Sequence, residues 1–150
     1  MSTGLTQRAQ APVVHRGLRA CVAPLALGAG ALAGAALLAV RSPYVPLSYG
    51  ICPSVALLGV VCPGCGGLRA THDLVTGDLV AAWHANPLWV VAVPVLVVAW
   101  SVWLVRRWRG EPARTRATWP AWVLIAVVVV FTVLRNVPAL APSLGPPPLL

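Results

Sequence analysis

Residues 88–105, LWVVAVPVLVVAWSVWLV, contain no charged side chain. A helix of this length reaches about 27 Å, close to the roughly 30 Å hydrocarbon core of a bilayer. Two further apolar runs flank it along the chain. We therefore predict an all-α membrane protein with three transmembrane helices at about residues 20–40, 87–105 and 119–135.

The composition also indicates lipid as the solvent for much of the chain. Apolar residues make up 59% of the 150 positions and charged residues only 9%, against about 25% charged residues in soluble domains. All eleven basic residues are arginine and the formal net charge is +8. The arginines lie beside the apolar runs, a pattern typical of membrane orientation, so we expect a lipid bilayer and no nucleic acid as the partner.

The arginines also predict the topology. Three spans place the basic tail 1–19 and the loop 106–116 on one side, and these segments hold eight of the eleven arginines. The positive-inside rule puts that side in the cytoplasm of a cell membrane. The segment 51–84 then lies outside, within a single membrane domain of residues 20–138 that precedes a Pro-rich tail at 139–150. Cleavage of the first run as a signal peptide is the alternative for the N-terminus.

The segment between the first two spans is predicted to hold a cysteine loop and a short amphipathic helix. Ile51–Val61 is apolar but too short to cross a bilayer, which favours a re-entrant or interfacial position. An amphipathic pattern covers residues 66–83, and a break at Gly77-Asp78 would divide it into two shorter helices.

Residues 62–69, CPGCGGLR, gather the most reactive side chains of the chain. Two thiols three positions apart around Pro-Gly predict a tight knuckle whose sulfurs face a common point. With Cys52 and His72, the thiols of Cys62 and Cys65 would give four ligands for zinc or copper.

Two other interpretations of the knuckle stay open. A Cys-x-x-Cys pair before a helix is typical of thiol–disulfide exchange, with Cys62, Cys65 and Cys52 as the redox candidates. In the second, the knuckle is a structural clip in a non-enzymatic scaffold or subunit that binds a membrane-protein partner or a second copy of itself. Whether the protein is an enzyme therefore stays undecided at this stage.

Several polar residues fall on the predicted outer side and are candidates to support the knuckle. Arg135 interrupts an apolar sequence, so it requires an acidic partner such as Asp73 or Asp78, or a position where its guanidinium reaches lipid headgroups. Asn86-Pro87 predicts the start of the second span, with the asparagine as N-cap. The supporting residues are Arg69, Asp73, Asp78, Asn86, Arg135 and Asn136.

The motifs taken together resemble DUF family 2752, small bacterial membrane proteins with a Cys-Pro-x-Cys-Gly-x-Thr-Arg core. The resemblance covers about residues 45–138, from Cys52-Pro53 through the knuckle to Arg135-Asn136-x-Pro138. Leu68 stands where the family typically has threonine, so any role of that hydroxyl is absent. The resemblance implies the architecture of a small membrane protein and assigns no activity.

Overall fold

The computed structural model describes residues 18–45, 52–111 and 118–144, and within these ranges its secondary-structure elements are all helices, without strands. Three long helices are α1 (Leu18–Val40), α5 (Pro87–Trp108) and α6 (Trp119–Arg135). Four short helices are α2 (Pro53–Leu58), α3 (Gly67–Thr76), α4 (Leu79–Ala85) and α7 (Ala141–Leu144). Most of the predicted cytoplasmic tail, Ile51, part of the basic loop and the end of the Pro-rich tail lie outside the described residues.

Two of the long helices, α1 and α5, are long and apolar enough to cross a membrane. They have 23 and 22 residues, which corresponds to about 33–35 Å at 1.5 Å per residue. α6 is equally apolar but has 17 residues, or about 26 Å. The structure therefore supports two of the three expected spans by length, and the third is a shorter apolar helix.

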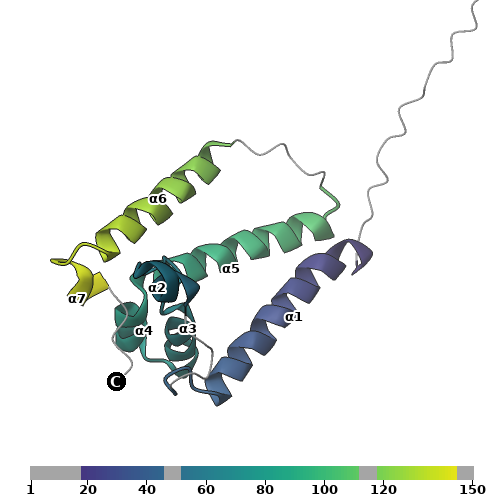
Figure 1. The fold of residues 1–150 in the computed structure, drawn as a ribbon. Helices are drawn as coiled ribbons and strands as arrows, with labels where there is room; N and C mark the ends of the chain where they lie inside the picture. The colour runs from purple at the N-terminus through teal and green to yellow at the C-terminus, as the bar shows by residue number, and fades with distance from the viewer. Residues whose placement is uncertain (1–17, 46–51, 112–117, 145–150) are drawn as a thin grey trace, which may run out of the picture.

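α1 and α5 run antiparallel and pack side by side (Figure 1). The indole Nε1 of Trp100 donates to the carbonyl oxygen of Pro24 at 2.9 Å. A Cβ added at Gly28 would lie only 2.7 Å from the Trp100 ring. The missing side chain at Gly28 thus allows the close approach of the two helices.

The short helices gather at one end of the long ones, beside the C-terminal end of α1 and the N-terminal end of α5 (Figure 1). The predicted helix at 66–83 is divided here into α3 and α4. Gly77 ends α3 in the left-handed conformation, with φ of 89°, and the Asp78 carboxylate accepts the Ala81 backbone N–H at 2.9 Å. These two local signals explain the break.

α6 approaches this group of short helices at its C-terminal end (Figure 1). Among the described residues it packs against α7 and has no extensive packing against α1 or α5. Most of its valine and leucine side chains are exposed. The end that carries Arg135 and Asn136 is therefore the part of α6 that is fixed to the rest of the protein.

Candidate metal centre

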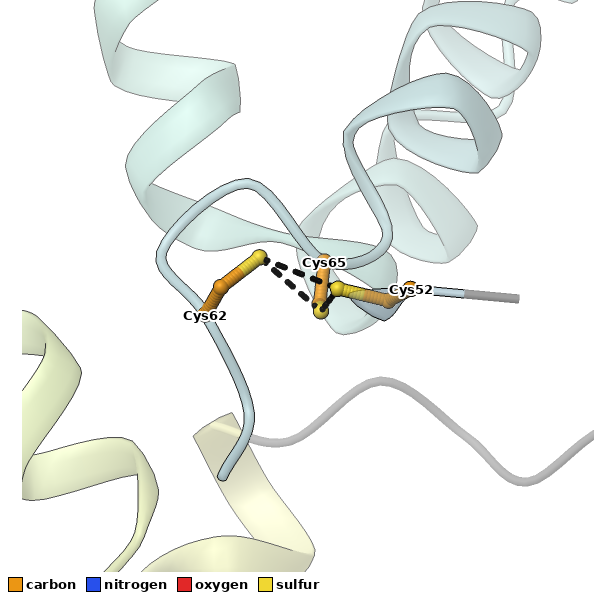
Figure 2. Close-up of side chains that lie close together, drawn as sticks. All are labelled: Cys52, Cys62 and Cys65. Carbon is orange, nitrogen blue, oxygen red and sulfur yellow. Dashed lines mark hydrogen bonds between the residues drawn. The ribbon is translucent and has the colours of Figure 1, made fainter. Parts of the chain in front are cut away.

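The knuckle is a tight turn built by local backbone hydrogen bonds. The Cys65 N–H donates to the Cys62 carbonyl at 3.1 Å, and the Gly67 N–H donates to the Gly64 carbonyl at 2.9 Å. Gly66 then takes φ of 82° as the N-cap of α3, a conformation that favours glycine. The turn presents the two cysteine side chains on the same side (Figure 2).

Cys52, just before α2, completes a group of three sulfur atoms with Cys62 and Cys65 (Figure 2). The Sγ–Sγ distances are 3.1 Å for Cys62–Cys65, 3.2 Å for Cys65–Cys52 and 3.6 Å for Cys52–Cys62. A disulfide requires about 2.05 Å, and all three cysteines are free thiols that are half-buried. The knuckle and the residue before α2 thus form one site.

The size of this triangle is close to that of a thiolate metal complex. Zinc–sulfur bonds of about 2.3 Å in a tetrahedron put neighbouring sulfurs about 3.8 Å apart. The observed edges are slightly shorter, so small outward side-chain rotations would fit an ion between the three atoms. The three cysteines can therefore hold a metal ion.

His72, the predicted fourth ligand, does not join this group among the described residues. Its Nδ1 lies 2.6 Å from the carbonyl oxygen of Leu38, at the end of α1. The packing of α3 against α1 directs the imidazole to this carbonyl. The structure brings together three of the four predicted ligands.

The pKa values of the Cys52 and Cys65 thiols are shifted in opposite directions by their surroundings. A hydrogen bond with the Ser54 hydroxyl at 3.0 Å, and then one from Cys65, lower the pKa of the Cys52 thiol to about 6. Burial, followed by hydrogen bonds to the other two cysteines, raises the pKa of the Cys65 thiol to about 12. Cys52 is therefore the nucleophilic thiol of the two at neutral pH.

Asn86 holds the knuckle through its side chain and is fully buried, at 0% exposure. Its Nδ2 donates to the carbonyl oxygens of Pro63 at 2.9 Å and Cys65 at 3.1 Å. Its Oδ1 accepts the Trp89 backbone N–H at 3.0 Å. This confirms the predicted N-cap of α5, and the same side chain joins that helix to the knuckle.

Arg135 reaches the same turn from α6 and is only 1% exposed. Its Nη1 donates to the carbonyl oxygens of Cys62 and Pro63, at 3.2 and 3.4 Å. Its Nε and Nη2 donate to the carbonyls of Leu144 at 2.9 Å and Ala85 at 3.5 Å. Among the described residues these partners are backbone carbonyls and not the carboxylates of Asp73 or Asp78, which were the predicted acidic partners.

Asn136 binds the backbone that leads into the knuckle. Its Oδ1 accepts the Val61 N–H at 2.9 Å, and its Nδ2 donates to the Val61 carbonyl at 2.9 Å. Its Nδ2 also donates to the Thr132 carbonyl at 2.8 Å. Three of the predicted supporting residues, Asn86, Arg135 and Asn136, thus contact the backbone of residues 61–65.

The other supporting residues lie elsewhere. Asp78 caps α4, while Asp73 is buried, at 4% exposure, and accepts the Tyr44 hydroxyl at 2.6 Å. The Arg69 guanidinium lies 5.9 Å from the centre of the Tyr44 ring. Burial and the Asp73 hydrogen bond raise the pKa of Tyr44 to about 12.

Tyr44, Asp73 and Arg69 form a second polar group, apart from the knuckle. Tyr44 is the member of this group that the sequence prediction missed. Its position just after the first apolar run indicates only an interfacial aromatic residue. Its partner Asp73 lies 29 positions along the chain, so no local pattern links the two.

The fold and the site define a helical protein with two helices able to span a membrane and a three-cysteine cluster at one end of them. Residues 52–100 match the model of a family described as Protein of unknown function (DUF2752). The match contains all three cysteines of the site and confirms the resemblance predicted from the knuckle motif. No curated protein and no solved structure matches the chain.

Proposed function

We propose that this protein is an integral membrane protein that binds a soft metal ion, zinc or Cu(I), through Cys52, Cys62 and Cys65. The observation that carries the proposal is the arrangement of three free sulfur atoms within 3.6 Å of one another. Thiolates are the preferred ligands of these two ions among protein side chains.

The backbone around the site supports this proposal because it is fixed from two sides. Asn86 and Arg135 donate to the carbonyls of residues 62, 63 and 65. Ligands on a turn held this way lose little conformational freedom when the ion binds. The pKa of about 6 for Cys52 also makes its thiolate available near neutral pH.

Three protein ligands leave one coordination position of zinc open to water or to an external ligand. Cu(I) is a soft ion that accepts three thiolates alone. The half-exposed sulfurs make such a site accessible from outside the protein. These features favour a site that exchanges its ion or an external ligand over a closed structural site.

The proposal includes the three-span topology, with the N-terminus in the cytoplasm and the cysteines on the other side of the membrane. The arginines of the tail and of the loop 106–116 support this orientation. An impermeant maleimide added to intact cells tests it. Labelling of Cys52 in cells is expected, and labelling only in inverted vesicles would refute the orientation.

Metal content tests the site itself. The full chain, purified in detergent with reductant and then exposed to Zn²⁺ or Cu(I), is expected to retain one ion per chain by elemental analysis. Cys62→Ser should lose the ion. Cys21→Ser is the matched control, because Cys21 is a free thiol buried in α1. Equal metal content in wild type and Cys62→Ser would refute the proposal.

Thiol–disulfide exchange is the second candidate, and the position of Cys65 favours it. The Cys65 sulfur lies within 3.2 Å of both other sulfurs, so it can form a disulfide with either. The Cys52 thiolate would attack a substrate disulfide and release one substrate thiolate. Cys65 would then displace the second, leaving a reduced substrate and an oxidised Cys52–Cys65 pair.

Trapping separates the two candidates. If exchange is the function, the double variant Cys62→Ser/Cys65→Ser, which lacks both thiols that can resolve it, accumulates a mixed disulfide through Cys52, visible as a shifted band on a non-reducing gel. If metal binding is the function, no such adduct forms and the ion is lost. Cys21→Ser again serves as the control in both measurements.

A further inference from the structure

The chain has only three acidic side chains, and all of them lie among the described residues. Each is engaged away from the knuckle. Asp73 accepts the Tyr44 hydroxyl, Asp78 caps the first turn of α4, and Glu111 pairs with Arg106 at 3.0 Å. No carboxylate side chain is therefore paired with Arg135.

Arg135 is nevertheless almost completely buried, at 1% exposure. The four carbonyl oxygens around it satisfy its N–H groups. Carbonyl dipoles supply no net negative charge, and a buried cation without a counter-charge is strongly unfavourable. The Phe131 ring, 5.1 Å from the guanidinium, adds only a weak attraction.

The side chains that can supply negative charge to Arg135 are those of Cys62 and Cys65, with which it interacts electrostatically. Arg135 donates directly to the carbonyl oxygen of Cys62. Its guanidinium therefore contacts the backbone of a residue that also carries one of the three sulfur atoms. Three thiolates around Zn²⁺ carry a net charge of −1, and three around Cu(I) carry −2. An anionic complex at this place would lie on the turn whose carbonyls this cation binds.

We propose that Arg135 is the counter-cation of an anionic metal–thiolate complex formed by Cys52, Cys62 and Cys65. This inference rests on the proposed metal-binding function and adds an electrostatic role for α6. The helix end is also held by Asn136, through both backbone groups of Val61. Anchoring of α6 and charge compensation are thus assigned to two neighbouring residues.

Arg135 and Asn136 offer a direct test, because Arg135 carries a charge and Asn136 does not. Affinities for Zn²⁺ and for Cu(I) are measured by chelator competition on the full chain in detergent. At short range and an effective dielectric constant of about 20, one unit of charge changes affinity by on the order of tenfold or more. Because the Cu(I) complex carries one more negative charge than the Zn²⁺ complex, Arg135→Gln should weaken Cu(I) binding about tenfold more than Zn²⁺ binding.

The control variants have different expected results. Asn136→Ala loosens the attachment of α6 without changing charge, so it should weaken both metals by the same factor. Arg135→Lys keeps the charge and loses the forked donors. Its ratio of Cu(I) to Zn²⁺ affinity should stay at the wild-type value, which also keeps the test available if Arg135→Gln does not fold.

The outcomes distinguish the two proposals. If the wild type binds neither metal, the metal-binding function fails and this inference fails with it. If the wild type binds both but Arg135→Gln leaves the affinity ratio unchanged, only the counter-cation role is refuted. A changed ratio in Arg135→Lys would refute it as well.

Discussion

Replacement of Asn86 tests whether the hydrogen bonds from this side chain to the knuckle backbone stabilise the protein. Asn86→Ala removes the cap of α5, which contributes about 1 kcal/mol. It also removes the donors to the Pro63 and Cys65 carbonyls. Each buried acceptor left without its partner costs about 1–3 kcal/mol. Pro63 keeps its longer bond from Arg135 at 3.4 Å, so only the Cys65 carbonyl is left without a partner and we expect a total loss of about 2–4 kcal/mol.

A second variant separates the two contributions. Asn86→Ser keeps an oxygen that can cap α5 but has no amide donors, so it should lose about 1–3 kcal/mol. Asp78→Ala is the control, because that side chain caps α4 in an exposed position and its loss should cost about 1 kcal/mol.

The assay is denaturant unfolding of the full chain in detergent, followed by circular dichroism. The free energies of unfolding of the three variants are compared with the wild type. Surface substitutions usually change the free energy of unfolding by no more than about 0.5 kcal/mol. If the value for Asn86→Ser lies within this range of the wild type, the Asn86 hydrogen bonds do not stabilise the knuckle and the prediction is refuted.

Other predictions concern the acidity of the thiols, the contact between α1 and α5, and the Tyr44–Asp73 hydrogen bond. In metal-free protein, alkylation of Cys52 should rise with a midpoint near pH 6, because its pKa is lowered to about 6 and the thiolate forms at lower pH. Cys65, with its pKa raised to about 12, should stay slow at neutral pH; equal rates at pH 7, measured by mass spectrometry, would contradict this. Gly28→Ala should destabilise the protein by about 1–3 kcal/mol through overpacking against the indole of α5, and an unchanged melting temperature would contradict it. Tyr44→Phe should lower the unfolding free energy by about 1–3 kcal/mol because it removes a donor from the buried Asp73 carboxylate; a stable variant by the same unfolding assay would show that the bond is not needed.

The features that the sequence predicted well are local ones. Asn86-Pro87 caps α5 because an asparagine oxygen and a proline ring act within one helical turn. The break at Gly77-Asp78 is likewise decided by adjacent residues. The uncharged run 88–105 lies within α5, as predicted for a segment that is long and apolar enough to cross a membrane.

The features that sequence reasoning missed depend on contacts between distant segments. Arg135 meets the Cys62 carbonyl across 73 positions, and an acidic partner was expected because charges, unlike carbonyl groups, are visible in a sequence. His72 follows Cys65 at a spacing that favours a ligand, yet the packing of α3 on α1 turns it to Leu38. Neither contact has a local signature.

The bonds between Asn136 and Val61 have a consequence for where the cysteines lie. The amide binds both the N–H and the C=O of Val61, as a neighbouring β-strand would. Non-helical backbone avoids lipid because its polar groups lack partners there. Because the Asn136 side chain binds both backbone polar groups of Val61, these groups do not require hydrogen bonds from water. In a membrane, the three-cysteine cluster could then lie closer to the lipid than a loop with unsatisfied backbone groups.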